Sequence, residues 1–215
     1  NRGQKEDSMS KMNPGSCSQM ITLAGALVLL MITADSGAAQ RFVSPDSLRQ
    51  LQSVVPLSGP PGTRVQISSE NLPLAARIHL AVGAIHAGFE TLAEGAQGEW
   101  GDMSGEIRIP ESASWDRPLY VIALNGVFSP IGLSNPFHVT NQEGLVRREG
   151  QVTEEFEGCL AFRDEDELLY ALTGELGTLG AGDQVIVEGI YLETSSCTEG
   201  STIEVVRTIS GRERP

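Results

Sequence analysis

Short alternating segments separated by glycine and proline turns run through most of this sequence, without a convincing long helical period. Polar and apolar residues alternate at 64–68 and again at 78–82. A Gly-Pro-Pro-Gly run at 59–62 and the dipeptide Asn125-Gly126 supply turns between such segments. Strands with turns every ~8–12 residues are typical of a β-sandwich. The sequence therefore predicts an all-β chain whose first folded part is a sandwich.

Three segments of this first part resemble a known family. They are SGPPGTRVQISSENLP at 58–73, GEIRIPESA at 105–113, and LYVIALNG followed by NPFHVT within 119–140. Together they resemble the immunoglobulin-like IPT/TIG class of bacterial surface and exported proteins. The chain departs from that pattern at Ser69, since the family has a glycine before the asparagine. The resemblance implies an Ig-like sandwich that serves as a spacer or protein-interaction module, without catalytic residues.

A second β unit follows a polar, glycine-containing linker. We expect one strand at 146–155, a hairpin within 159–174 around an acidic tip, a short helical turn and loop within 175–184, and strands at 184–193 and 201–210, with Gly189 as a bend. This order is typical of a small five-stranded OB-like barrel. The run GDQVIVEGIYLE at 182–193, with Cys159, Cys197 and a Leu-Tyr pair at 169–170, resembles a small exported bacterial OB-like domain. The resemblance implies a fold and a compartment, and no activity.

The N-terminal region carries the features of a signal peptide. Residues 21–34 are apolar and uncharged, which is shorter than the ~20 residues of a membrane-spanning helix. Small residues follow, and we predict cleavage after Ala39. The alternatives are an uncleaved anchor or a buried helix. We expect a periplasmic or extracellular protein without stable membrane insertion after cleavage. The predicted divisions are a signal peptide with upstream residues (1–39), a linker (40–53), the sandwich (54–140), a second linker (141–148), the barrel (149–210) and a tail (211–215).

Two cysteines remain after that cleavage, because Cys17 is removed with the signal peptide. An even pair in an exported protein predicts a disulfide, here Cys159 with Cys197. The alternatives are two free thiols or half of a metal site, although zinc usually takes four ligands. A bridge over this separation should contribute about 3–4 kcal/mol to a barrel with a small core.

Composition excludes several classes of function. The net charge is −13, which disfavours nucleic acid and anionic membranes as partners. Lys5 and Lys11 are the only lysines, so a Schiff base or a phosphate-binding loop has no lysine in the folded part. Neither a G-x-S-x-G elbow nor a G-x-G-x-x-G turn after a strand occurs. We predict no catalytic residues, no cofactor and no metal site.

The histidines and the acidic run are the remaining candidates for catalysis or metal binding. His79, His86 and His138 form no paired motif, and scattered histidines in a sandwich are more often surface residues than ligands. The acidic run 164–167 lacks the glycine and ligand spacing of a calcium loop. We interpret it as a solvated hairpin tip, with weak calcium binding and catalysis as alternatives.

Aromatic residues give the candidate binding sites. Trp100 and Trp115 are flanked by turn residues, so each either contacts a partner or plugs the sandwich core. In the barrel, Phe162, Tyr170 and Tyr191 could line a shallow groove. We expect a non-enzymatic envelope or secreted binding protein whose partner is a protein or a carbohydrate. The alternatives are a small-ligand- or sugar-binding protein that uses the barrel face, and a hydrolase with an unrecognised site.

Overall fold

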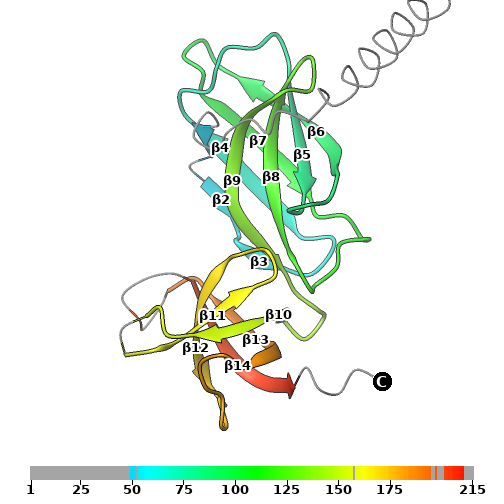
Figure 1. Cartoon of the computed structure of the whole chain (residues 1–215). Helices are drawn as coiled ribbons and strands as arrows, with labels where there is room; N and C mark the ends of the chain where they lie inside the picture. Colours follow the sequence, from blue (N-terminus) through cyan, green and yellow to red (C-terminus); the bar gives the residue numbers. More distant parts are fainter. Residues whose placement is uncertain (1–48, 52, 157, 195–196, 198–200, 211–215) are drawn as a thin grey trace, which may run out of the picture. The chain divides into compact units, whose positions relative to one another are not determined.

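The computed structural model describes residues 49–51, 53–156, 158–194, 197 and 201–210 (Figure 1). The predicted signal peptide, Cys17, residues 40–48 of the predicted linker and the tail at 211–215 lie outside the described residues. Every regular element in the described part is a strand, which confirms the predicted all-β class. Among these residues, no helix is long and apolar enough to span a membrane.

The first nine strands form one sheet with the order β1-β9-β8-β5-β6-β7-β4-β2, and β3 pairs with β9. Neighbouring strands are antiparallel except where β1 and β3 pair with β9. The strands are β1 (Arg49–Gln50), β2 (Ser53–Val55), β3 (Ser58–Gly59), β4 (Arg64–Ser69), β5 (Ile78–Gly83), β6 (Phe89–Gln97), β7 (Met103–Arg108), β8 (Pro118–Asn125) and β9 (Pro130–Val139).

The expected sandwich takes the form of a single sheet that curls around its own core. Strand β6 connects the two layers, because its first part pairs with β5 while Ala96 and Gln97 pair with β7. Gly95 lies at this changeover. A Cβ atom there would come within 3.3 Å of both Ile78 and Met103, so glycine brings the two layers close together. We call this region the curled sheet.

The alternation seen in the sequence becomes the core of the curled sheet. In β4, Val65 and Ile67 are buried while Arg64 and Gln66 are exposed. Strand β5 contributes Ile78, Leu80 and Val82 to the same core. Each such side chain contributes about 1.5–3 kcal/mol when it is removed from water.

The remaining strands form a closed barrel with the order β10-β11-β12-β14-β13, in which β13 also pairs with β10. All neighbours are antiparallel except β12 and β14, which are parallel. The strands are β10 (Leu145–Thr153), β11 (Leu160–Asp164), β12 (Leu169–Gly174), β13 (Gln184–Leu192) and β14 (Ser201–Ser210). The five strands and the hairpin around the acidic tip agree with the sequence prediction.

Three details of the barrel sharpen or correct that prediction. Strand β10 begins at Leu145, one residue before the strand expected at 146–155. The helical turn expected within 175–184 is wrong, because this segment consists of turns without a helix. The bend expected at Gly189 is a β-bulge, and a Cβ atom there would lie only 2.3 Å from the carbonyl oxygen of Glu204.

The predicted disulfide is present. Cys159 and Cys197 are bonded across a separation of 38 residues, with Cα atoms 6.3 Å apart. The bridge ties the β10–β11 connection to the β13–β14 connection. It therefore links two connections that share no β-ladder among the residues that the structure describes.

Candidate functional site

One end of the curled sheet exposes a group of large apolar side chains. They are Leu74, Trp100, Val127 and Phe128, with exposed fractions of 72%, 85%, 80% and 52%. We call these four residues the apolar tip. They lie on three loops that meet at one end, since Ile78 at the start of β5 pairs with both Gly95 of β6 and Asn125 of β8. Exposed apolar groups gathered in this way mark interaction sites more often than scattered ones do.

The turn that carries Val127 and Phe128 is held rigidly by Asn125. The side-chain Oδ1 of Asn125 accepts hydrogen bonds from the backbone N–H groups of Val127 (3.1 Å) and Ser129 (3.0 Å). The Asn125 carbonyl accepts a third from Phe128 at 2.9 Å. Phe128 has a φ of 59°, which is uncommon for a bulky residue, and strain of this kind concentrates at functional positions. Its ring stacks on His79, with centroids 4.7 Å apart.

The neighbouring loop is fixed by Gln97 at the end of β6. Its side chain accepts a hydrogen bond from Ala75 N–H (2.9 Å) and donates one to the Pro73 carbonyl (3.1 Å). The third loop is tied to the same segment, because Leu72 N–H donates to the Gly101 carbonyl at 2.9 Å. The three loops therefore present the apolar tip on an ordered frame.

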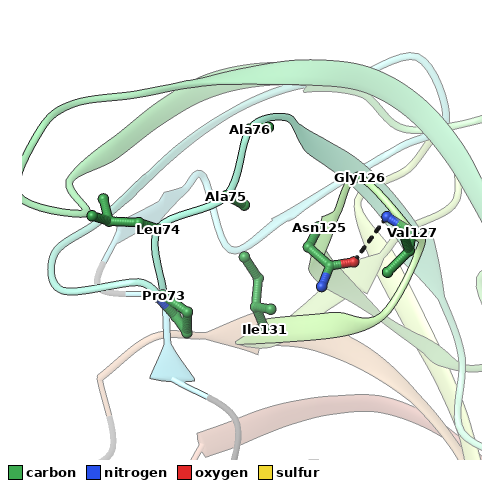
Figure 2. Close-up of a pocket in the computed structure, with 8 residues that line it drawn as sticks. All are labelled: Pro73, Leu74, Ala75, Ala76, Asn125, Gly126, Val127 and Ile131. Atoms are coloured by element: carbon green, nitrogen blue, oxygen red, sulfur yellow. Dashed lines mark hydrogen bonds between the residues drawn. The ribbon is translucent and has the colours of Figure 1, made fainter.

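A hollow of about 270 Å³ opens between two of these loops (Figure 2). No charged side chain lines it. Asn125 is its one polar side chain, and the oxygen of that carboxamide already accepts two hydrogen bonds. The hollow suits an apolar group. Its lining consists of Pro73, Leu74, Ala75, Ala76, Asn125, Gly126, Val127 and Ile131.

The two tryptophans have different environments. Trp100 projects from the apolar tip, as the interpretation of a partner-contacting residue requires. Trp115 is half-buried and packs against the core of the curled sheet, as expected for a residue that plugs the core.

The predicted barrel groove is wrong for two of its three residues. Phe162 and Tyr170 are buried in the barrel core, so neither can line a surface groove. Tyr191 is half-buried, and its hydroxyl lies 3.2 Å from that of Ser201. Strand parity does not distinguish the two faces here, because apolar residues of both parities occur in β11 and in β12.

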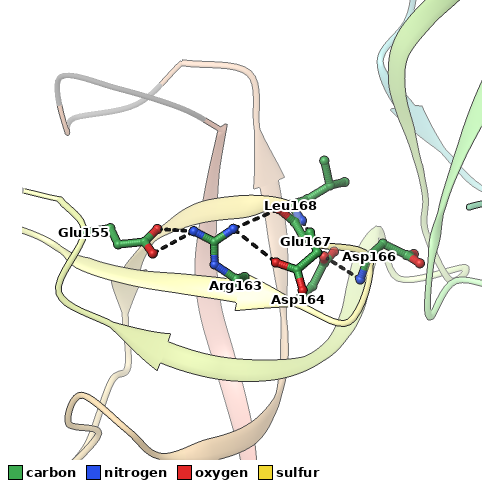
Figure 3. A network of polar contacts seen from close by, with 6 residues as sticks. All are labelled: Glu155, Arg163, Asp164, Asp166, Glu167 and Leu168. Atoms are coloured by element: carbon green, nitrogen blue, oxygen red, sulfur yellow. Dashed lines mark hydrogen bonds and ion pairs between the residues drawn. The ribbon is translucent and has the colours of Figure 1, made fainter. Parts of the chain in front are cut away.

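The prediction of a solvated acidic tip is wrong for its first residue. Asp164 is buried, while Glu165 and Glu167 are exposed. Oδ1 of Asp164 accepts hydrogen bonds from the backbone of Asp166 (3.0 Å) and Leu168 (2.8 Å), so this carboxylate organises the turn (Figure 3). No group of three or more His, Cys, Asp or Glu side chains suited to a metal ion occurs among the described residues.

Beside it, the guanidinium of Arg163 forms ion pairs with Glu155 at 2.5 Å and with Glu167 at 3.3 Å (Figure 3). These contacts occupy two carboxylates of the hairpin region. Glu167 is the one of these two that belongs to the acidic tip, so an exposed carboxylate of the tip forms an ion pair within the hairpin.

The surface position expected for the histidines is confirmed for His86 and is wrong for His138. His86 is exposed on a turn, and His79 is half-buried against Phe128. His138 is fully buried at the end of β9, where its Nδ1 lies 3.2 Å from the guanidinium of Arg148.

Sequence reasoning missed Leu74, Val127 and Phe128 as candidate binding residues. The available signal was the position of apolar residues directly beside turn residues, after Leu72-Pro73 and after Asn125-Gly126. It also missed the burial of Arg148, which lies in the strand expected at 146–155.

Comparison with known proteins gives no assignment. No protein-family model matches this chain, and no curated protein matches it either.

Proposed function

We propose that this chain is a non-enzymatic binding protein of the cell envelope or the extracellular space, and that it contacts a protein partner through the apolar tip. The observation that carries the proposal is the exposure of four large apolar side chains on three ordered loops at one end of the curled sheet. Burying one such side chain contributes about 1.5–3 kcal/mol. Tryptophan is among the residues that most often dominate binding energy at interfaces.

The chemistry of the tip favours a polypeptide over a carbohydrate. A sugar site needs several polar groups that match hydroxyls, and the hollow offers only the Asn125 carboxamide. An uncharged lining also excludes a strongly charged ligand from the hollow, because a buried charge there would lack a counter-ion. An aliphatic or aromatic side chain of a partner protein satisfies both conditions.

Three further features agree with the proposal: the barrel topology, the IPT/TIG-like segments and the disulfide. Five strands in the order β10-β11-β12-β14-β13, closed and with a single parallel pair, support an OB-like barrel. The IPT/TIG-like segments of the curled sheet support an Ig-like interaction module. The disulfide supports an oxidising compartment, and therefore export by the proposed signal peptide.

Site-specific photocrosslinking tests the proposal. A photoreactive phenylalanine analogue at Leu74 should crosslink to a defined protein in the envelope or culture fraction of the producing bacterium. Adding Trp100→Ala to the same chain should weaken that crosslink at least fivefold. The matched control places the analogue at Ile190, which is also an exposed apolar residue (42%) but lies on β13 of the barrel.

The outcome decides among the alternatives. A protein band at position 74 that is absent at position 190 supports the proposal. Equal labelling at both positions, or crosslinks to polysaccharide alone, contradicts it. Binding that survives loss of the tip but is lost on removal of the barrel would instead favour the sugar- or small-ligand-binding alternative.

A further inference from the structure

Arg148 is a fully buried cation at the start of the barrel, with 1% of its surface exposed. Its guanidinium donates to two backbone carbonyls, those of Trp115 (2.9 Å) and Arg147 (2.6 Å). Its Nη2 lies 3.2 Å from Nδ1 of His138. On another side, its Nε is 4.0 Å from Oδ2 of Asp164, which also accepts a hydrogen bond from the Tyr170 hydroxyl at 3.2 Å.

The contact with Arg148 fixes the protonation state of His138. A guanidinium has only donors, so Nδ1 of His138 must accept, and the single proton of the neutral ring resides on Nε2. The ring is fully buried and stacks on Tyr191, with centroids 3.8 Å apart, while Tyr170 meets it edge-on at 5.8 Å. Burial and, secondarily, the charge of Arg148 hold the pKa of His138 well below its ordinary value of 6.5.

The other titratable groups around Arg148 come from several elements. Asp164 of β11 has its pKa raised by burial. Tyr170 of β12 and Tyr120 of β8 also have raised pKa values, chiefly through burial, and that of Tyr120 is about 12. Charged residues that line a small hollow with Arg148 are Asp116, Arg117, Glu149, Glu165 and Asp166. Of the groups described here, His138 is the one that contacts Arg148 and has an ordinary pKa between 5 and 8.

We propose that His138 and Arg148 form an acid-sensitive latch, in which protonation of His138 below neutral pH breaks the contacts of β9 with β10, β12 and β13. An imidazolium at this position would present a donor to a donor, 3.2 Å from a permanent cation. Both charges would be desolvated, so the charged ring must leave the site. Arg148, Tyr170 and Tyr191 then lose the packing that His138 provides.

The direction of the pH effect follows from the lowered pKa of His138. The unfolded chain takes up this proton near pH 6.5, whereas the folded chain resists it to a lower pH. Stability from this group is therefore complete above about pH 6.5 and decreases as the pH falls. Asp164 acts in the opposite sense, because its pKa is raised. Its contribution increases on acidification, within a window that extends down to about pH 4.

Urea unfolding of the full chain between pH 8 and pH 5 tests the latch. The unfolding equilibrium constant should increase below pH 6.5, by up to about tenfold per pH unit for one proton. His138→Gln should remove most of this increase. His86→Gln is the matched control, since His86 is exposed, and it should leave the increase in place.

A second measurement covers the case in which His138→Gln does not fold. NMR of the wild-type chain with labelled histidines should show the His138 ring neutral, with its proton on Nε2, at pH 6. A ring that titrates near pH 6.5 while the chain stays folded would overturn the proposal. So would an equal pH dependence in the wild type and the folded His138→Gln variant.

Discussion

The curled sheet and the barrel bury different kinds of side chains. The buried polar side chains of the curled sheet are serine, threonine and His138, within a core that spans many strands. The barrel encloses fewer apolar residues, yet buries Arg148, Asp164 and Glu188. Glu188 is only 2% exposed and pairs with Arg147 at 3.1 Å and with Arg207. The small domain thus combines a disulfide and paired charges with a limited apolar core.

This difference teaches where each region is vulnerable. In the curled sheet, the free energy of folding is spread over many apolar contacts. A single substitution at its surface therefore changes the free energy of unfolding little. In the barrel, a few charged groups and one covalent bond are concentrated in a small volume. Removing one member leaves its partner buried and uncompensated. The following predictions test this contrast, beginning with the largest effect.

Arg148→Ala should reduce the free energy of unfolding by about 3–5 kcal/mol, because it leaves the Asp164 carboxylate buried without its cation and Nδ1 of His138 buried without a hydrogen-bond donor. Urea denaturation measures the loss. Arg64→Ala is the control, since Arg64 forms an exposed ion pair with Glu106 on the curled sheet and should change stability by less than about 1 kcal/mol. Similar losses for both variants would break the comparison.

Replacing both Cys159 and Cys197 by serine should cost about 3–4 kcal/mol, because a bridge over 38 residues restricts the unfolded chain. Amide hydrogen exchange should show the loss in β10–β14, with protection of β4, β5 and β8 retained. Uniform loss of protection over both regions would show that they unfold as one unit. Reduction of the wild-type chain should reproduce the effect.

Trp115→Ala should cost about 1–3 kcal/mol, since the half-buried ring packs against the core of the curled sheet. Its backbone carbonyl, which accepts from Arg147 and Arg148, is retained in the variant. Thermal unfolding followed by circular dichroism measures the shift. An unchanged melting temperature would mean that the ring contributes nothing to the core.

Trp100→Ala should change the free energy of unfolding by no more than about 0.5 kcal/mol, because its ring is 85% exposed. The same variant should weaken partner crosslinking at position 74 at least fivefold. The pair Trp100 and Trp115 thereby separates binding from stability within one region. Retained crosslinking with Trp100→Ala would remove this residue from the proposed interface.

The sequence predicted what depends on local pattern. Alternation at 64–68 and 78–82 predicted strands, which are β4 and β5, and the oxidised pair Cys159–Cys197 followed from cysteine arithmetic. The continuity of the curled sheet could not be predicted in this way. It depends on β6 changing partners near Gly95, which local alternation does not encode.

Buried polar residues were the hardest to predict. A charged residue such as Arg148 in a strand indicates a solvent-exposed position, and its burial requires His138 and Asp164 to meet it from β9 and β11. Phe162 and Tyr170 posed a related difficulty. Alanines at 161 and 171 are equally compatible with an interior position, so only barrel closure shows which side faces inward.

The parallel pairing of β12 with β14 also has a consequence for the order of events during synthesis. Strand β14 is the last of the barrel in the chain, yet it closes the gap between β12 and β13. Until residues 201–210 are available, β12 and β13 each present an open edge to other chains. The ladders β10–β11, β11–β12 and β10–β13 can form earlier, but the barrel closes only when β14 pairs with β12 and β13. Its vulnerability to misassociation lasts until translation has passed Ser210, and pairing this late in the chain favours slow closure.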